Sequence, residues 1–412
     1  MPPVLNNNNI INYLTLRYDP TTTTTLITPL NAGSFVEGKF DNVQSKILEI
    51  VKDDLDVKLF QRKVSRISIA LSGGIDSGFT LLMLKKFFPE IKVNTVCVGF
   101  RDRDDEVLRA EEISRRYDCD FHELYIDNVL EDLPKLISIS GAPKWNLYHF
   151  YSLAEAKKYS DIFFSGDGGD EIFGGYTFRY KKFLYELEKI EYPSWLDKSK
   201  IYLSCHDRDW VPDQGELFHK SLNYSWNMIY ENFKPYFDNG LHPINQLLLA
   251  DFNGKLLHDW IPSNYEFGRH LNLEINSLFL NPKMISFSTK LPWYYKYNYI
   301  DDVGKVPLLS IMHTFQGFEG FNGIKKGFSL NLINMWHNYG ENIISSYLNA
   351  DSHTVKGNII SGCWITKAIS LVNDSLDNDL KIRYISKLLS LFSFEVWYRI
   401  FISCSLKSHS KL

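Results

Sequence analysis

Residues 66–77 read RISIALSGGIDS, and they carry the strongest local signal for the fold. A short apolar strand, 66–71, runs straight into a glycine-rich turn, 72–77, and a helical stretch follows up to Phe88. The same alternation continues along the chain, and strands that alternate with helices of this length predict βαβ units on a parallel sheet. We therefore expect an α/β fold with helices on both faces of the sheet. Further strands are expected at 93–100, 120–126 and 161–164, and the helices between them at about 104–117, 129–139 and 151–159.

The segments on either side of this alternating region have a different character. The first forty residues are polar and rich in turn-forming residues, with an Asn run at 6–9 and a Thr run at 21–25. Their pattern predicts short strands or a wrapping arm rather than a domain. A helix is expected at 43–52, and beyond about residue 176 we expect helical periods and no further strands. These shifts predict an arm at 1–42, an α/β core at 43–190 and a mainly helical lobe at 191–412.

Composition argues against several classes of protein. The 412 residues carry a net charge of −4, whereas a nucleic-acid-binding face is normally basic, so we expect no nucleic acid as a partner. The five cysteines form no CxxC pair, which gives no support to a zinc cluster, and their odd number fits a reducing compartment. The N-terminus lacks the pattern of a secretory signal, and no run of about eighteen apolar residues suggests a membrane span. A cytoplasmic protein without membrane contact is expected.

The turn SGGIDS, residues 72–77, has the properties of a phosphate-binding loop. It follows a strand and opens a helix, where backbone N–H groups attract anions and glycines let the main chain approach a phosphate closely. Asp76 would repel a phosphate on its own but suits a Mg²⁺ ion that bridges phosphates. The alternative is a plain strand–helix turn with Asp76 as a helix-terminus carboxylate, and spacing leaves both interpretations open. The loop is neither GxGxxG nor GxxxxGK[ST], which disfavours hydride transfer and kinase-like chemistry.

A second glycine-rich loop follows the expected strand at 161–164. It reads SGDGGDE over 165–171 and continues as IFGGY to Tyr176. The carboxyl ends of parallel strands lie at one edge of a sheet, so the two loops should meet where ligands of such sheets bind. Three carboxylates within five residues are costly to hold together unless a cation or a proton-transfer role compensates. The loop therefore predicts a functional site more than a solvated acidic turn.

Together, SGGIDS and SGDGGDEIFGGY resemble the synthetase domain of asparagine synthetases, within the PP-loop group of ATP pyrophosphatases. The first motif is shared across that group, whereas the second is much narrower. The segments VCVGF at 96–100, FHE at 121–123 and KKGF at 325–328 resemble further family segments, so the match covers nearly the whole chain. The resemblance implies a Rossmann-like sheet of the adenine nucleotide alpha hydrolase type, with ATP and Mg²⁺ as cofactors.

The resemblance also implies roles for individual residues. Lys305 matches the family's pyrophosphate-binding lysine, and Asp167 matches an acidic residue that we take as the general base; both are expected to be catalytic. Asp76 and Asp170 are expected to bind Mg²⁺. The acceptor-substrate side is expected to include Glu171 and Glu274, and the ATP-binding residues are expected to be Leu71, Ser72, Gly73, Gly74, Asp76, Ser77, Val98, Ser165 and Gly166.

The chain departs from the family pattern at its start. Full-length members begin with a Cys directly after the initiator Met, the nucleophile of their glutaminase domain, whereas here Pro2 follows Met1. We expect the chain to lack that domain, to use free ammonia or a separate glutaminase subunit, and not to hydrolyse glutamine by itself.

A second departure lies at 265–281, where the family usually reads D-R-x-S-M-x-x-x-x-E-x-R-x-P-F-L-D. Several charges on the acceptor-substrate side are neutral in this chain, which puts aspartate as substrate in doubt but not the use of ATP. The replacements are Tyr265 for the first Asp, Asn276 for the Arg, Leu278 for the Pro and Asn281 for the final Asp.

The resemblance implies an ATP-dependent, AMP-forming carbon–nitrogen ligase that makes asparagine from aspartate, ATP and ammonia. A carboxylate oxygen would attack the α-phosphorus, pyrophosphate would leave, and ammonia would attack the resulting acyl-adenylate. Two alternatives stay open: amide formation with another carboxylic acid, as in β-lactam synthetases and lasso-peptide cyclases, and a non-catalytic homologue. A tRNA-thiolating enzyme is disfavoured because the chain lacks a cysteine pair and a basic face.

Overall fold

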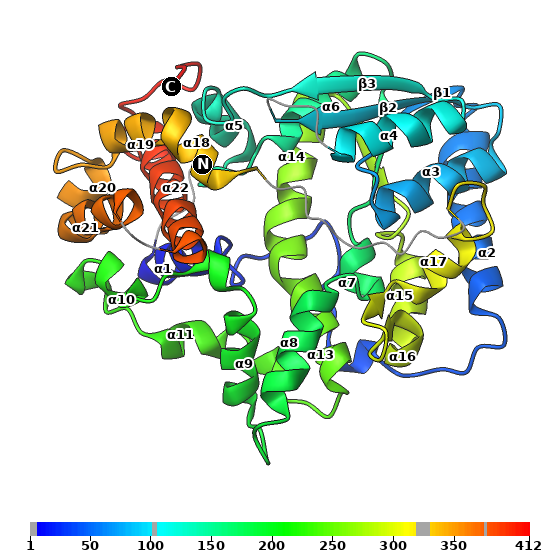
Figure 1. Ribbon diagram of the computed structural model, residues 1–412, viewed down its shortest axis with the longest axis horizontal. Coiled ribbons are helices and arrows are strands. Elements are labelled where there is room, and N and C mark those ends of the chain that lie inside the picture. Colours follow the sequence, from blue (N-terminus) through cyan, green and yellow to red (C-terminus); the bar gives the residue numbers. More distant parts are fainter. Residues whose placement is uncertain (1–5, 101–104, 319–329, 375–376) are drawn as a thin grey trace.

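The computed structural model describes residues 6–100, 105–318, 330–374 and 377–412. A twisted sheet with its helices lies at one end of the molecule, and a helical lobe lies at the other (Figure 1). The segment KKGF at 325–328 lies outside the described residues.

The main sheet has five parallel strands in the order β3-β2-β1-β4-β5. The register pairs Ala70 with Val96 and Ser165 with Ser277, so the carboxyl ends of neighbouring strands meet at one edge. The predicted α/β fold with a parallel sheet is therefore confirmed. The strands are β1 (Arg66–Ala70), β2 (Lys92–Gly99), β3 (Asp120–Tyr125), β4 (Ile162–Ser165) and β5 (Glu274–Ser277).

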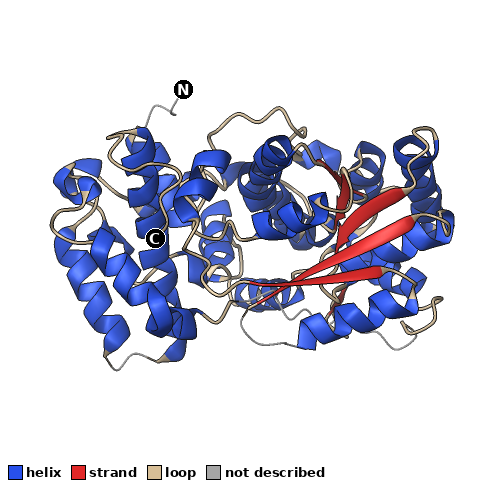
Figure 2. Ribbon diagram, turned by 90° about the horizontal axis from the view of Figure 1, so that it is seen from above, coloured by secondary structure: helices blue, strands red, loops and turns tan. Residues whose placement is uncertain are grey.

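Helices cover both faces of the sheet (Figure 2) because both faces are apolar. Successive residues of a strand point to opposite faces. On one face Ile69 lies in the same buried cluster as Phe79, and on the other Val98 and Phe163 lie with Phe150. The first face is covered by α3 (Ile75–Phe87) and α4 (Asp105–Arg116), and the second by α6 (His149–Lys157).

The expectation that strands end before residue 176 is wrong, because β5 joins the sheet beside β4. This strand is short and carries the polar side chains of Glu274 and Asn276, so it lacks the apolar run that marks a buried strand. Its pairing begins where the Glu274 N–H donates to the Asp161 carbonyl at 2.9 Å. A further two-stranded sheet, β6 (Tyr297–Asn298) and β7 (Val303–Gly304), ends directly before Lys305.

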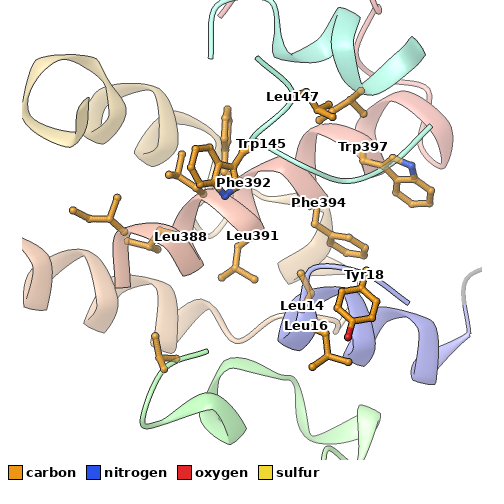
Figure 3. Packing of buried hydrophobic residues seen from close by; sticks show 14 of the residues in the cluster. Leu14, Leu16, Tyr18, Trp145, Leu147, Leu388, Leu391, Phe392, Phe394 and Trp397 are labelled. Atoms are coloured by element: carbon orange, nitrogen blue, oxygen red, sulfur yellow. The ribbon is translucent and has the colours of Figure 1, made fainter. Parts of the chain in front are cut away.

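The N-terminal arm also differs from expectation, since it forms a helix, α1 (Asn7–Leu16), rather than short strands. The Asn6 side chain accepts the Asn9 N–H at 2.9 Å and so caps the helix. Leu14 and Leu16 are buried against α22 (Asn378–Phe401), and Figure 3 shows Leu14, Leu16 and Tyr18 near Phe394 of that helix. The arm is therefore part of the core of the helical lobe.

Helices make up most of the chain beyond β4, as predicted, and the predicted helix at 43–52 appears as α2 (Val43–Leu55). Among the described residues, none of the helices is long and apolar enough to cross a membrane. The division at residue 190 stays a prediction. The remaining α-helices are α5 (Leu133–Ser140), α7 (Gly169–Phe173), α8 (Thr177–Leu187), α9 (Trp195–Ser204), α10 (Gln214–Leu217), α11 (Trp226–Glu231), α12 (Lys234–Phe237), α13 (Pro243–Asp251), α14 (Ile261–Leu271), α15 (Pro282–Lys290), α16 (Trp293–Lys296), α17 (Val306–Met312), α18 (Leu332–Met335), α19 (Glu341–Tyr347), α20 (His353–Lys356) and α21 (Gly362–Asn373).

Candidate active site

The first glycine-rich loop connects β1 to α3 at the carboxyl edge of the sheet. Gly73 has a φ of +64°, and a Cβ there would lie 2.9 Å from the Arg109 Cδ, so the turn requires glycine. The Ser72 N–H donates to the Ser77 hydroxyl at 3.2 Å, which closes the loop over the start of α3. The helix begins at Ile75, inside the motif, so the N–H groups of its first turn lie at this edge. The geometry is that of an anion-binding helix terminus.

The second loop packs directly on the first. A Cβ at Gly166 would lie 2.6 Å from the Asp76 Cβ, closer than real Cβ atoms come to another atom, and 3.1 Å from the Ser77 N. Glycine at this position lets the two loops touch. Two motifs that are far apart in the sequence thus form one site, at the place where parallel sheets bind ligands.

The side chains of Asp76, Asp170 and Lys305 meet at this junction. The Lys305 Nζ lies 2.5 Å from the Asp76 Oδ2 and 2.6 Å from the Asp170 Oδ1. Burial opposes the charge of Lys305, but the carboxylates of Asp170 and Asp76 outweigh it and hold the pKa of the ammonium above its usual value. Lys305 is therefore a buried cation that stays charged at neutral pH.

The same carboxylates suit a Mg²⁺ ion. In the part of the chain that the structure describes, no group of three or more His, Cys, Asp or Glu side chains gathers to hold a metal. Mg²⁺, however, is commonly held by one or two carboxylates together with substrate phosphates and water. Asp76 and Asp170 converge on one point beside a helix terminus suited to phosphate, so this pair of carboxylates fits the ion.

Asp167 lies beside this cluster and accepts three side-chain hydrogen bonds. Its Oδ1 accepts the Trp260 Nε1–H at 2.6 Å, and its Oδ2 accepts the Asn264 Nδ2–H at 2.8 Å and the Ser165 hydroxyl at 2.7 Å. Burial raises the pKa of Asp167, and these three donors lower it without cancelling the effect. The carboxylate is thus held in a fixed orientation in a partly desolvated place, which is what a positioned proton acceptor requires.

Trp260 and Asn264 are residues that the sequence reasoning missed. They stand four residues apart at the start of α14, so one helical face presents both donors to the second loop. His149 stacks on Trp260 with ring centroids 4.6 Å apart, and a buried Lys144–Asp259 ion pair lies directly behind. The i, i+4 spacing of Trp and Asn was visible in the sequence, but nothing in it named Asp167 as the acceptor.

The remaining predicted residues belong to the expected ATP side, Leu71 and Val98, or to the expected acceptor-substrate side, Glu171 and Glu274. The Leu71 N–H donates to the Val96 carbonyl at 3.0 Å, which ties the first loop to β2, the strand that carries the buried Val98. Glu171 is buried in the second loop, where its Oε1 accepts the Tyr176 hydroxyl at 2.7 Å. Glu274, by contrast, starts β5 and therefore lies at the opposite end of the strand from the loops.

Glu274 is held at the surface by an arginine. The Arg62 Nη1 and Nη2 each donate to one of its carboxylate oxygens at 2.8 Å, and this fork lowers the pKa of Glu274. The structure therefore does not bring Glu274 to the Lys305 cluster, and its assignment to the acceptor-substrate side stays a prediction.

A cavity of about 850 Å³ opens between α14 and β5, and Ser165 and Asp167 form part of its wall. Tyr265 and Asn276, two of the residues that depart from the family pattern, also line it. The other two residues that depart from the family pattern, Leu278 and Asn281, contribute to packing and to helix capping. Leu278 is buried in the core, and the side chain of Asn281 caps α15 and donates to Asp54 at 2.6 Å.

Comparison with known proteins places the fold and the site in a family. The family model "Asparagine synthase" matches residues 57–399, which span both loops, Lys305 and α14. The parallel sheet and the two glycine-rich loops at its carboxyl edge define an α/β protein with a candidate anion-binding site. The chain belongs to the asparagine synthase family.

The sequence identity between this chain and individual relatives is low. "Asparagine synthetase [glutamine-hydrolyzing] 1" of Bacillus subtilis is 26% identical over 297 residues, which cover 63% of this chain and 46% of that protein. "Asparagine synthetase [glutamine-hydrolyzing]" of Gallus gallus is 26% identical over 154 residues, 32% of this chain and 27% of that protein. The chain thus spans less than half the length of these curated relatives.

Among solved structures, an NH3-dependent NAD synthetase from Campylobacter jejuni is 15% identical and covers 49% of this chain and 99% of that one. Its TM-score of 0.25 is too low to carry an argument about function.

Proposed function

We propose that this chain is an AMP-forming ligase that activates a carboxylate with ATP and passes the acyl group to ammonia. One observation carries the proposal: Lys305 and two carboxylates from different glycine-rich loops converge beside the start of α3. A buried cation next to a helix terminus is an arrangement that stabilises the charge of a departing pyrophosphate.

Each group has a defined task in this chemistry. The first loop and the start of α3 bind the phosphates through backbone N–H groups, and Lys305 neutralises charge as the bond between the α- and β-phosphates breaks. Asp167 accepts a proton from the nitrogen that has attacked the acyl-adenylate. A Mg²⁺ ion held by Asp76 and Asp170 would supply further positive charge to the phosphates.

The relatives' names favour aspartate as the acid and asparagine as the product, with the nitrogen supplied as free ammonia or by a separate glutaminase. A second candidate is a different carboxylic acid. It is favoured by the cavity beside Asp167, because Tyr265 and Asn276 line that cavity where the family pattern has charged residues. Both candidates share the same ATP chemistry.

The test is product analysis with purified protein, Mg²⁺, ATP, ammonium and one acid at a time. We expect AMP and pyrophosphate in equal amounts with the correct acid and neither product without it. Release of ADP and phosphate instead would contradict the proposal, because the cleavage would then lie between the β- and γ-phosphates.

A further inference from the structure

The cavity between α14 and β5 is large for a free amino acid. Its volume of about 850 Å³ lies in the range of about 300–1,000 Å³ that is usual for pockets holding ligands of drug size. It extends along β5 from Glu274 to Ser277 and reaches the second loop at Asp167. A ligand that fills it would span the length of the strand and end at Ser165 and Asp167.

The wall formed by β5 is the edge of the sheet. In the described part of the chain no strand pairs with β5 on the side away from β4. The Glu274 N–H donates to the carbonyl of Asp161, the residue directly before β4. In a parallel pair of strands, alternate residues direct their main-chain groups to the partner strand. The main-chain groups of Ile275 and Ser277 therefore point away from β4. Such an edge accepts an extended chain through main-chain hydrogen bonds.

The charges on the cavity wall do not favour a free amino acid. Its α-carboxylate would need a cation, but the two cations that line the cavity, Lys58 and Arg269, already form ion pairs with Asp54 at 2.7 Å and Glu266 at 2.8 Å. Position 276, which lies on β5 inside the cavity, carries an uncharged Asn. The cavity wall therefore offers polar uncharged groups and paired charges to a ligand.

Apolar side chains complete the cavity. Leu26 and Ile27 of the N-terminal arm, Ile261 of α14 and Leu280 after β5 all line it. They offer contacts to side chains of an extended chain, while β5 offers contacts to its backbone. The cavity therefore has both recognition elements of a peptide site.

We propose that the cavity binds an extended peptide alongside β5 and that the peptide's C-terminal carboxylate is the acid that ATP activates. The orientation follows from β5: a peptide parallel to the strand ends near Ser277, whose hydroxyl donates to the Asp167 carbonyl at 2.6 Å. This inference rests on the proposed ligase function and names its substrate class.

The chemical step balances with the proposed substrates. A C-terminal carboxylate oxygen forms a bond to the α-phosphorus, and the bond from that phosphorus to the bridging oxygen of pyrophosphate breaks. Ammonia then forms a C–N bond, AMP leaves with the carboxylate oxygen, and one proton passes from nitrogen to Asp167. The product is a peptide with a C-terminal amide.

The first test measures binding without ATP, so that it does not depend on activity. The probe is a fluorescent library of N-acetylated tetrapeptides with free C-terminal carboxylates, and free aspartate serves as competitor. We expect the library to bind and aspartate not to displace it. Absence of binding would overturn the inference. AMP formation with aspartate but not with the library would also overturn it while leaving the proposed ligase function intact, whereas no AMP with any acid would count against that function.

Two variants test the location of the site. Asn276→Trp fills the cavity, and we expect it to weaken library binding at least about tenfold by steric exclusion, whereas the same change at the exposed Asn8 should have no effect. Asn276→Arg places a cation in the cavity, and we expect it to weaken binding of the peptide library and to improve competition by aspartate. Unchanged peptide binding in folded Asn276→Arg would overturn the inference even if Asn276→Trp failed to fold.

Discussion

At the scale of single residues, two roles can be distinguished for Asp76, because one affects enzymatic activity and the other affects stability. It lies in the first turn of α3, where any carboxylate gains from the helix dipole, and it also contacts Lys305 beside Asp170. If the Asp76 carboxylate holds a cation against the phosphates, activity depends on that carboxylate. If its role is only to favour the helix, stability depends on it slightly.

We predict that Asp76→Asn lowers ATP-dependent pyrophosphate release at least about 100-fold, because a neutral amide replaces a carboxylate at the phosphate site. The assay is pyrophosphate release with the correct acid. The exposed Asp41→Asn serves as the matched control and should keep full activity. A folded Asp76→Asn protein with normal turnover, destabilised by about 1 kcal/mol or less, would support the helix-terminus role instead.

A variant of Asp167 can distinguish the two half-reactions, adenylation of the acid and transfer of the acyl group to nitrogen. If it accepts the proton in the nitrogen step, Asp167→Ala should still release pyrophosphate, while amide formation falls by about two orders of magnitude, the usual contribution of a positioned base. AMP would then appear without matching amide because water consumes the acyl-adenylate. Pyrophosphate and amide are measured in the same reaction. An equal fall in both products would show that Asp167 acts on the phosphates or on the shape of the loop.

At the scale of elements, α14 positions Asp167 and is itself supported by α6. His149 of α6 stacks on Trp260, and burial together with Lys144 lowers the pKa of His149 to about 3. The unfolded chain titrates this group near its ordinary value of about 6.5. Between these values the unfolded state binds a proton that the folded state does not, so stability is fully present above about pH 6.5 and falls as the pH is lowered.

We predict that His149→Phe removes this acid sensitivity while keeping an aromatic ring on Trp260. Between pH 7 and pH 5 the parent chain should lose about 2 kcal/mol more free energy of unfolding than the variant. Denaturant unfolding at both pH values measures the difference, with His409→Phe at an exposed position as the control. Parallel pH profiles for parent and variant would show that His149 is accessible to protons in the folded state.

At the scale of the whole molecule, buried charges tie the N-terminal arm to the helical lobe. The Arg17 Nε lies 3.1 Å from the Asp209 Oδ1, and Lys255 contacts the same carboxylate. Burial would raise the pKa of Asp209, but Lys255 and Arg17 outweigh it and hold the pKa well below its usual value. The buried carboxylate is compensated by these two cations, whose own side chains stay partly exposed, 19% for Arg17 and 40% for Lys255.

Asp209→Ala should therefore destabilise the protein by about 1.5–3 kcal/mol, the usual contribution of hydrogen bonds to a charged group. Asp207 provides a matched control two residues away, because its contact with Lys182 is long, at 3.7 Å, and exposed. Asp207→Ala should cost about 0–1 kcal/mol. The midpoint and slope of urea unfolding measure both effects. Equal costs for the two changes would contradict the role of Asp209.

Much of the fold could be predicted because its signals are local. The strand at 66–71, the turn at 72–77 and the helices that follow are each specified by neighbouring residues, and the structure places them within a few residues of expectation. The two loops could be joined in advance because strand ends of a parallel sheet share one edge. The sequence alone thus determined the fold class and the pairing of the glycine-rich loops.

Other features depend on contacts between distant segments, so they became visible only in the folded chain. β5 has too few apolar residues to signal a strand, and it exists because β4 supplies its hydrogen bonds. Trp260 and Asn264 are site residues because the start of α14 lies against Asp167. Glu274 lies at the surface, where it accepts a hydrogen bond from Arg62. The cavity beside Asp167 has the same origin: its walls come from the arm, α14 and β5, and no local pattern records how separate elements meet.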